Sequence, residues 1–163
     1  MDGGQGSVSS RPAKGLRLRL CEPDDLPLLM ALGKAYWAEA GDGVLPIDEA
    51  KAAWWVARAI HRLFALAVEE RGKIRGALIL DDTPPWWSSA PALFETGFYI
   101  DPKYRKGTRA AADLLDAGKA IAADLGVPFF VTPMTSADID RKDRFFQSRG
   151  FKRIGGFYRW SNT

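Results

Sequence analysis

The spacing of hydrophobic residues in the first part of the chain changes from alternate positions to helical spacing, and this predicts a strand followed by helices. Leucines at alternate positions of residues 16–20, separated by arginines, predict a half-buried strand. Apolar positions at helical spacing then predict a helix that begins at Asp24 or Asp25 and runs to about Ala40. A second helix with the same spacing is expected after Asp48.

Two hydrophobic runs follow these helices and are separated by a short polar turn. The runs at 63–68 and 74–80 flank the sequence Arg-Gly-Lys, which is typical of a β-hairpin. Three prolines and two serines interrupt residues 81–91, so this stretch is expected to be a loop. Residues 93–100 then return to the composition of a strand.

The remainder of the chain is arranged around one long amphipathic helix. Apolar residues mark one face of 108–125, and Gly126 is the expected end of the helix. The nearly all-apolar run 127–132 is typical of a strand at the centre of a sheet. A shorter helix at 140–149 and two short strands within 151–160 complete the pattern.

These elements predict an α/β fold with a mixed central sheet of six to seven strands and about four flanking helices. A chain of 163 residues fits one domain, and we assign it to residues 16–163. Residues 1–15 are rich in glycine and serine and have almost no large apolar side chains. Because they cannot offset the entropy of ordering, they are expected to form a disordered tail.

Cysteine and histidine content restricts the chemistry. The chain has one cysteine, Cys21, and one histidine, His61, so it can form neither an internal disulfide nor a zinc site of the usual kind. Charged residues interrupt every apolar run before it reaches the length of a membrane span, and the N-terminus lacks the apolar core of a secretory signal. We therefore expect a cytoplasmic protein that contacts no membrane and carries no metal, although this content leaves a metal site built only from carboxylates open.

The candidate chemistry lies where the strand 93–100 passes through a basic turn into the long helix. The first N–H groups of a helix and its dipole attract anions. Gly107 permits close backbone approach, while Arg105, Lys106 and Arg109 add positive charge to a chain whose net charge is +3. From the residues alone, this is a phosphate-binding turn.

The turn sequence PKYRKGTRA, at residues 102–110, resembles the pyrophosphate-binding turn of the GNAT N-acetyltransferases, Arg/Gln-x-x-Gly-x-Gly/Ala. Arg105 and Ala110 match this pattern, and Thr108 replaces its first glycine. The order of elements over residues 16–160 is also similar to that family. The resemblance implies an acetyl-CoA-dependent N-acetyltransferase, with the pantetheine arm along the strand that ends at Ile100. It places the cofactor at Ile100, Arg105, Lys106, Gly107, Thr108, Arg109 and Ala110.

The same resemblance suggests the catalytic groups. Many GNAT members use a glutamate of this strand as general base, and Glu95 is in that position; an outward-facing edge glutamate is the alternative. The tyrosine that often protonates the leaving thiolate is replaced by Phe146, four residues before Gly150-Phe151. Alternation along the strand puts Tyr99 on the same face as Glu95, so we rank Tyr99 first as proton donor, before Tyr158.

The sequence leaves the acceptor open. A small-molecule or peptide amine is expected, and the resemblance leaves a homodimer open.

Two other functions remain open. Because Thr108 and Phe146 depart from the pattern of the family, a non-catalytic acyl-CoA sensor is one alternative. The basic residues between Arg141 and Arg153 keep a nucleic-acid-binding module as another, although a solvated charged face is favoured there. Trp86 and Trp87 are expected to cover the core, a partner or the acceptor site.

Overall fold

The computed structural model describes residues 15–40, 45–132 and 138–156. Its centre is a mixed sheet in which the five strands lie in chain order, each antiparallel to its neighbour except the last, which is parallel. The strands are β1 (Arg17–Leu20), β2 (Ala65–Glu70), β3 (Lys73–Asp81), β4 (Leu93–Ile100) and β5 (Phe129–Phe130).

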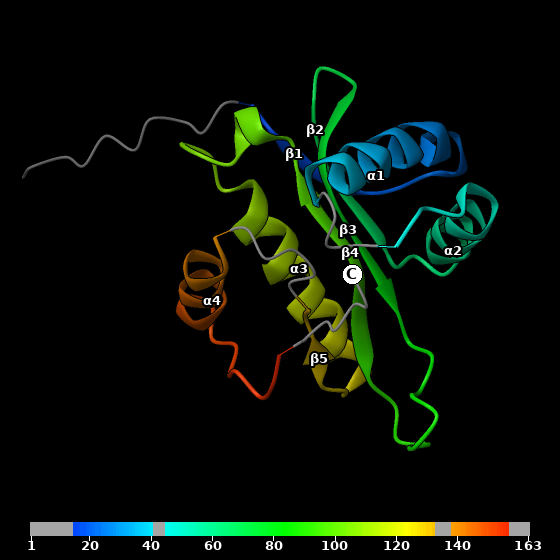
Figure 1. Ribbon diagram of the computed structural model, residues 1–163, viewed down its shortest axis with the longest axis vertical. Helices are drawn as coiled ribbons and strands as arrows, with labels where there is room; N and C mark the ends of the chain where they lie inside the picture. Colours follow the sequence, from blue (N-terminus) through cyan, green and yellow to red (C-terminus); the bar gives the residue numbers. More distant parts are fainter. Residues whose placement is uncertain (1–14, 41–44, 133–137, 157–163) are drawn as a thin grey trace, which may run out of the picture.

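Helices cover both faces of this sheet (Figure 1). The helices α1 and α2 lie on one face, and α3, with α4 beside it, lies on the other. Their bounds are α1 (Leu26–Ala40), α2 (Glu49–His61), α3 (Ala110–Leu125) and α4 (Ile139–Ser148), with short 3-10 turns η1 (Pro23–Asp25) and η3 (Pro102–Tyr104). The expectation of an α/β fold with four flanking helices is thus confirmed.

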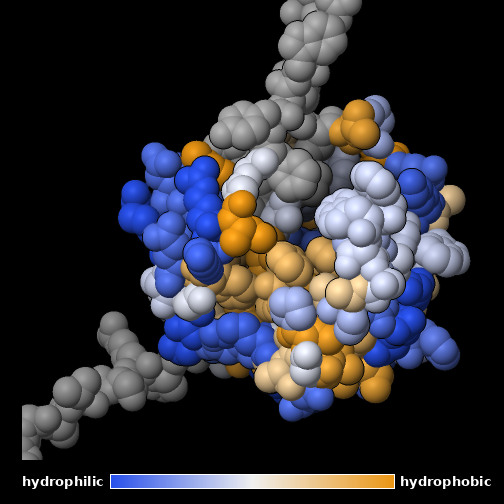
Figure 2. Space-filling model, turned by 90° about the horizontal axis from the view of Figure 1, so that it is seen from below, coloured by the Kyte–Doolittle hydropathy of each residue, from blue (hydrophilic) through white to orange (hydrophobic). Residues whose placement is uncertain are grey.

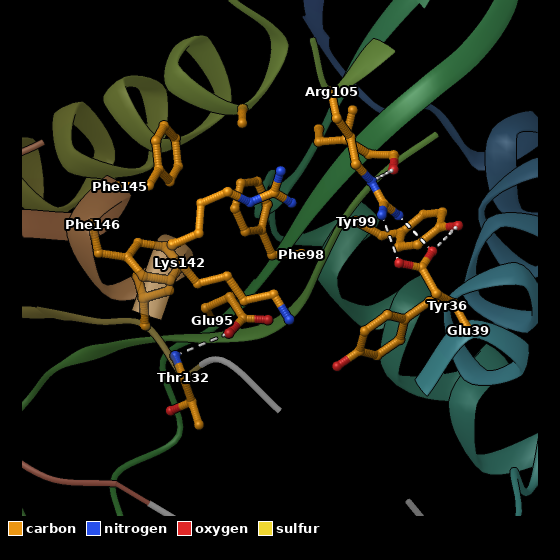
Figure 3. Close-up of a pocket in the computed structure, with 14 residues that line it drawn as sticks. Tyr36, Glu39, Glu95, Phe98, Tyr99, Arg105, Thr132, Lys142, Phe145 and Phe146 are labelled. Atoms are coloured by element: carbon orange, nitrogen blue, oxygen red, sulfur yellow. Dashed lines mark hydrogen bonds and ion pairs between the residues drawn. The ribbon is translucent and has the colours of Figure 1, made fainter. Parts of the chain in front are cut away.

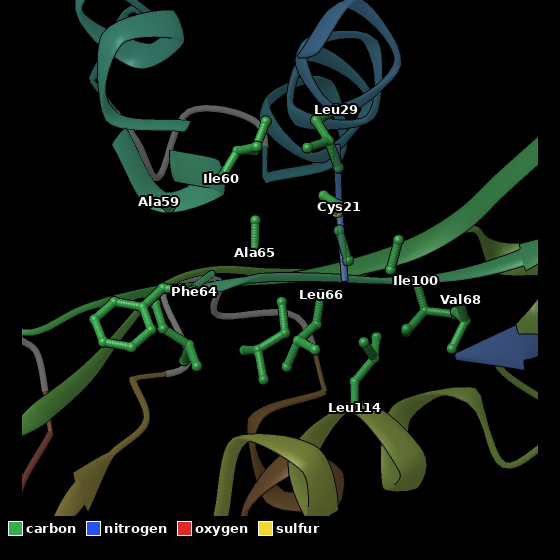
Figure 4. Packing of buried hydrophobic residues seen from close by; sticks show 14 of the residues in the cluster. Cys21, Leu29, Ala59, Ile60, Phe64, Ala65, Leu66, Val68, Ile100 and Leu114 are labelled. Atoms are coloured by element: carbon green, nitrogen blue, oxygen red, sulfur yellow. The ribbon is translucent and has the colours of Figure 1, made fainter. Parts of the chain in front are cut away.

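The sequence explains where these helices begin and end. The Asp48 side chain accepts a hydrogen bond from the Lys51 N–H at 3.0 Å and so caps α2. Gly126 has a left-handed backbone, with φ of 68°, and ends α3 as predicted. The core forms between the helices and the sheet (Figure 4) and includes fully buried Leu78, Leu93 and Leu114.

Two expectations about the strands are wrong in part. The described residues form five strands, not six to seven, because Phe151–Gly156 have no strand structure and the rest of the final segment lies outside the described residues. The strand expected at 127–132 is only Phe129–Phe130, since it pairs with β4 at just two positions. Pairing, rather than apolar composition, limits its length.

The first strand forms where expected, but with the opposite face half-buried. Leu18 and Leu20 are 40% and 42% exposed, while the side chain of Arg19 is only 19% exposed. Arg19 donates to Asp25 at 2.6 and 2.9 Å and to Glu69 at 2.6 Å. Because β1 is an edge strand, these charge-assisted bonds decide which face is covered, and the two leucines lie at the sheet border.

Candidate active site

A fork between two parallel strands holds a cavity. β4 and β5 pair only through Leu93–Phe129 and Phe94–Phe130 and then separate. A cavity of about 300 Å³ lies at this fork and is bounded by α1, α3 and α4 (Figure 3). Its lining comprises Tyr36, Glu39, Glu95, Phe98, Tyr99, Ile100, Arg105, Ala111, Val131, Thr132, Arg141, Lys142, Phe145 and Phe146.

Glu95 lies inside the fork, so the structure does not place it on an outer edge of the sheet. Its Oε2 accepts a hydrogen bond from the Thr132 backbone N–H at 3.1 Å, which joins the two separating strands. Burial raises the pKa of Glu95 to about 7, and the Thr132 hydrogen bond opposes this only partly. A carboxyl group with this pKa can exchange a proton near neutral pH.

A β-bulge orients this part of β4. The pairing with β3 passes from Ile79–Gly97 directly to Leu80–Glu95, which leaves Thr96 as the extra residue. Thr96 is exposed, and its hydroxyl donates to the Ile79 carbonyl at 3.3 Å. The simple alternation that the sequence argument applied to Glu95 and Tyr99 is therefore interrupted, although both side chains line the same cavity.

Tyr99 forms a hydrogen bond with Glu39, a residue of α1 that the sequence did not single out. Its hydroxyl donates to Glu39 Oε2 at 2.9 Å, and its ring packs against Tyr36 of α1 with centroids 5.7 Å apart. Burial, followed by the hydrogen bond to Glu39, raises the pKa of Tyr99. The predicted proton donor is thus held towards α1 by a carboxylate.

Arg105 also points towards α1 (Figure 3). Its Nη1 and Nη2 donate to the two oxygens of Glu39, each at 2.6 Å, and its Nε donates to the Ile100 carbonyl at 2.9 Å. The guanidinium lies 5.1 Å from the centre of the Tyr99 ring. Three of its five N–H donors therefore have protein partners.

The rest of the predicted phosphate turn lies at the start of α3. Gly107 has φ of 71°, a conformation that side chains disfavour, and Lys106 beside it is exposed. The Thr108 hydroxyl accepts from the Ala110 N–H at 3.3 Å and also bonds the carbonyl of Tyr104. Thr108 thus fastens the turn to the helix, a role that the glycine it replaces could not fill.

The first turn of α3 supplies donors, but the arginine beside it has partners of its own. Arg109 forms an ion pair with Asp113 at 3.1 Å and lies 3.8 Å from Asp116. The first N–H groups of a helix have no intrahelical acceptor, so those of Ala111 and Ala112 remain available to an anion. A phosphate placed at this turn would therefore meet mainly backbone donors and Lys106.

Four lining residues that the sequence did not single out as site residues come from helices without a recognisable motif. Tyr36 and Glu39 are three residues apart on α1, and Lys142 and Phe145 have the same spacing on α4, so each pair shares a helical face. The three-residue spacing therefore indicated which residues share one face of each helix. What the sequence could not show is that these two faces meet across the fork.

The basic C-terminal residues are divided between the cavity and the surface. Arg141 and Lys142 line the cavity and do not belong to a uniformly solvated face. Others are paired with acids: Arg149 with Asp116, and Arg153 with Asp143. The described part of this region thus has its positive charge partly neutralised by acids.

Trp86 and Trp87 do not cover the protein's own core. They are 93% and 70% exposed, and their rings contact each other edge to face at 5.6 Å. They belong to the loop at the lower end of the molecule in Figure 1. Seen from that end, apolar side chains lie across the middle of the surface, with hydrophilic ones on both flanks (Figure 2).

Comparison with known proteins gives one clear result. No protein-family model and no curated protein sequence matches the chain. Solved structures, in contrast, are similar to the chain. A protein of Clostridium acetobutylicum, described as a predicted acetyltransferase with acetyl-CoA, has 17% identity and a TM-score of 0.66 over 90% of this chain and 96% of its own. A GCN5-related N-acetyltransferase of Ralstonia eutropha has 18% identity and a TM-score of 0.66, with coverages of 90% and 99%.

An aminoglycoside 6'-N-acetyltransferase of Acinetobacter baumannii is similar to the same extent, with 15% identity and a TM-score of 0.64 over 91% of this chain and 99% of its own. The chain has the GNAT acetyltransferase fold. Sequence identities this low establish only the GNAT fold, so the reaction has to be inferred from the candidate site. Within the described residues, no helix of this GNAT-fold protein has the length and apolar character needed to cross a membrane.

Proposed function

We propose that this GNAT-fold protein is an N-acetyltransferase that moves an acetyl group from acetyl-CoA to a primary amine. The observation that carries the proposal is Glu95, a carboxyl group with a pKa of about 7 inside the fork of β4 and β5. A base with this pKa can accept a proton from an attacking amine at neutral pH. The neighbouring structure with acetyl-CoA supports the choice of acyl donor.

The residues around the fork fit such a donor. The backbone N–H groups at the start of α3, with Lys106 and Thr108, would hold the pyrophosphate. The apolar walls of the cavity, formed by Phe98, Ile100 and Val131, suit the pantetheine arm. Acetyl-CoA would supply a thioester, which a neutral amine can attack directly.

In the proposed mechanism, Glu95 takes the proton of the amine as its nitrogen attacks. Thr132 holds the carboxylate in place through its backbone N–H. Tyr99 stays our first candidate for the proton that the leaving thiolate needs, and Glu39 fixes its direction. Phe146 faces Phe98, with ring centroids 6.4 Å apart, and offers no proton from α4. Tyr158, the second candidate, lies outside the described residues.

Thermal melting followed by a thiol-release assay tests this function. Acetyl-CoA should raise the melting temperature, because a ligand that binds only the native state stabilises it. Glu95→Gln should keep this shift and lower turnover by roughly 10²–10⁴-fold, the contribution of a general base. Glu49→Gln, which changes an exposed glutamate of α2, is the matched control. Full turnover in Glu95→Gln contradicts the assigned role.

A second function is favoured by one observation. Phe146 lines the cavity from α4 without a hydroxyl group, so a non-catalytic acyl-CoA sensor on the same fold is the alternative. A sensor would show the acetyl-CoA melting shift without thiol release for any amine. Thiol release by the parent would favour the enzyme, whereas release that appears only in Phe146→Tyr would favour the sensor, because the parent would then lack the hydroxyl that this change returns to the wall of the fork.

A further inference from the structure

The guanidinium of Arg105 has no edge open to a phosphate. A guanidinium binds an anion best through two neighbouring N–H donors on one edge, and it has two such edges. One edge is formed by both terminal nitrogens, and the other by Nε and the terminal nitrogen on its side. Glu39 occupies the first edge with two contacts of 2.6 Å, and the Ile100 carbonyl accepts from Nε on the second edge at 2.9 Å. The protein itself therefore occupies both edges.

The side chains of Glu39, Tyr99 and Arg105 contact one another in pairs. Besides the contacts of Arg105 with Glu39, the Tyr99 hydroxyl donates to Glu39 Oε2 at 2.9 Å, and the guanidinium lies 5.1 Å from the centre of the Tyr99 ring. Tyr36 packs against the same ring from α1, with centroids 5.7 Å apart. Figure 3 shows this group together on the α1 side of the cavity. Tyr99 is thus held at its hydroxyl and over its ring at the same time.

Arg105 also balances the charge of Glu39. Its hydrogen bonds, opposed by burial, lower the pKa of Glu39, so this side chain is a carboxylate at neutral pH. Burial raises the pKa of Tyr99, the bond to Glu39 raises it further, and the charge of Arg105 acts in the opposite direction. Without the guanidinium, the carboxylate would hold the Tyr99 proton more firmly. Arg105 therefore affects both the position of this hydroxyl and its ability to give up a proton.

The exposure of the ion pair indicates what it contributes. The side chains of Arg105 and Glu39 are 30% and 41% exposed, and ion pairs that are open to solvent add little to stability. Their contacts nevertheless join the end of β4 to the end of α1 at the wall of the cavity. The pair therefore orders this wall more than it stabilises the fold.

We propose that Arg105 is a positioning residue for Tyr99 and does not bind the pyrophosphate of the acyl donor, the role that the turn motif implies. The backbone N–H groups at the start of α3, with Lys106, would then hold the pyrophosphate. Tyr99, kept in place by Arg105 and Glu39, gives its proton to the leaving thiolate of CoA and regains one from water. The inference rests on the proposed acetyltransferase function and assigns Arg105 to the transfer step instead of to binding.

Binding and turnover, measured separately, test the inference. The Kd of acetyl-CoA would be measured by calorimetry, and kcat by thiol release with the best amine from an acceptor screen. Arg105→Gln should change the Kd less than about threefold, whereas loss of a phosphate ligand would raise it about 10- to 100-fold. The same variant should lower kcat about 10- to 100-fold, which is part of the contribution of a general acid.

Two further variants separate positioning from loss of charge. Arg105→Lys keeps the charge but lacks the planar fork, so it should also lower kcat about tenfold or more without a change in Kd. In a Tyr99→Phe background, Arg105→Gln should lower kcat less than about twofold further, because Arg105 acts through Tyr99. Arg71→Gln, which changes an exposed arginine at the β2–β3 turn, is the control and should leave Kd and kcat unchanged.

A spectroscopic measurement needs neither cofactor nor acceptor. In protein labelled with carbon-13 at the tyrosine ring carbon that bears the hydroxyl, the NMR signal of each tyrosine reports the hydrogen bonding of that hydroxyl. The Tyr99 signal is the one lost in Tyr99→Phe. Arg105→Gln should move this signal and leave that of Tyr104, whose hydroxyl donates to Glu70 at 2.6 Å.

The outcomes are distinct. A Kd that Arg105→Gln raises about tenfold or more, and that Arg105→Lys restores, makes Arg105 a phosphate ligand and overturns the inference. An unchanged kcat, a full further loss in the Tyr99→Phe background, or an unmoved Tyr99 signal also overturns it, while the proposed function stands. Absence of acetyl-CoA binding or of thiol release in the parent instead overturns the proposed function and this inference with it.

Discussion

The pKa of Glu95 makes a prediction about stability that needs neither cofactor nor acceptor. The unfolded chain loses the proton of this carboxyl near pH 4.5, whereas the folded chain keeps it to about pH 7. Between these values the folded state binds more protons than the unfolded state, so its stability falls as the pH rises. Glu95→Gln removes the titrating group while it keeps the size of the side chain and an oxygen for the Thr132 N–H.

The magnitude follows from the width of this window. Each pH unit between the two pKa values lowers the free energy of unfolding by about 1.4 kcal/mol, so the whole interval between them lowers it by roughly 3 kcal/mol. Part of the loss, about 1 kcal/mol, has already occurred at pH 5. Relative to Glu95→Gln, the parent should therefore lose about 2 kcal/mol between pH 5 and pH 8. Glu95 is only half-buried, so solvent screens the carboxylate and this is an upper value.

Urea unfolding followed by tryptophan fluorescence measures the difference. Parent and Glu95→Gln would be compared at half-unit steps from pH 5 to pH 8, with Glu49→Gln as the control for an exposed glutamate. The other charged side chains that line the cavity, Glu39, Arg105, Arg141 and Lys142, are present in both proteins. If the two free-energy curves stay parallel within about 0.5 kcal/mol, Glu95 is not desolvated and its assignment as a base near neutral pH is refuted.

Three further predictions concern packing, the phosphate turn and the N-terminal segment. Gly118→Ala should destabilise the fold by about 1–3 kcal/mol, because its Cβ would lie 2.9 Å from Phe129. Gly33→Ala, in α1 with free space around it, should stabilise by about 0.5–1 kcal/mol in the same urea assay; equal effects contradict the packing argument. Gly107→Val should abolish the acetyl-CoA melting shift, since φ of 71° excludes a branched side chain; an unchanged shift places the cofactor elsewhere. Removal of residues 1–13 should leave both melting temperature and shift unchanged, and loss of either shows that they contribute to structure.

Most of the fold could be predicted because its elements have strong local signals. The hairpin, the long helix ended by Gly126 and the helix after Asp48 formed within one or two residues of the predicted bounds. The errors occurred where pairing decides the outcome. Nothing in the apolar run 127–132 shows that only Phe129 and Phe130 find partners on β4, and the burial of Arg19 depends on acids elsewhere in the chain.

The candidate site was predictable only along one strand and one turn. Glu95 and Tyr99 were found because they belong to a segment that resembles a known motif, and both line the cavity. The opposite walls come from α1 and α4, whose side chains carry no motif. Lys142 is one of several basic residues in a row, and only the packing of α4 across the fork distinguishes it from the others.

Arg105 shows why a matching residue does not determine its own contact. The resemblance implied a pyrophosphate ligand, and a guanidinium at this point of the turn is chemically suited to that role. Yet Glu39, 66 residues earlier, holds its two terminal nitrogens. A phosphate at the turn must therefore use the two remaining N–H donors or compete with this carboxylate. Because Glu39 also accepts from Tyr99, such competition would alter the direction of the proposed proton donor. The predicted phosphate turn and the proposed proton donor are thus connected through one acidic side chain of α1.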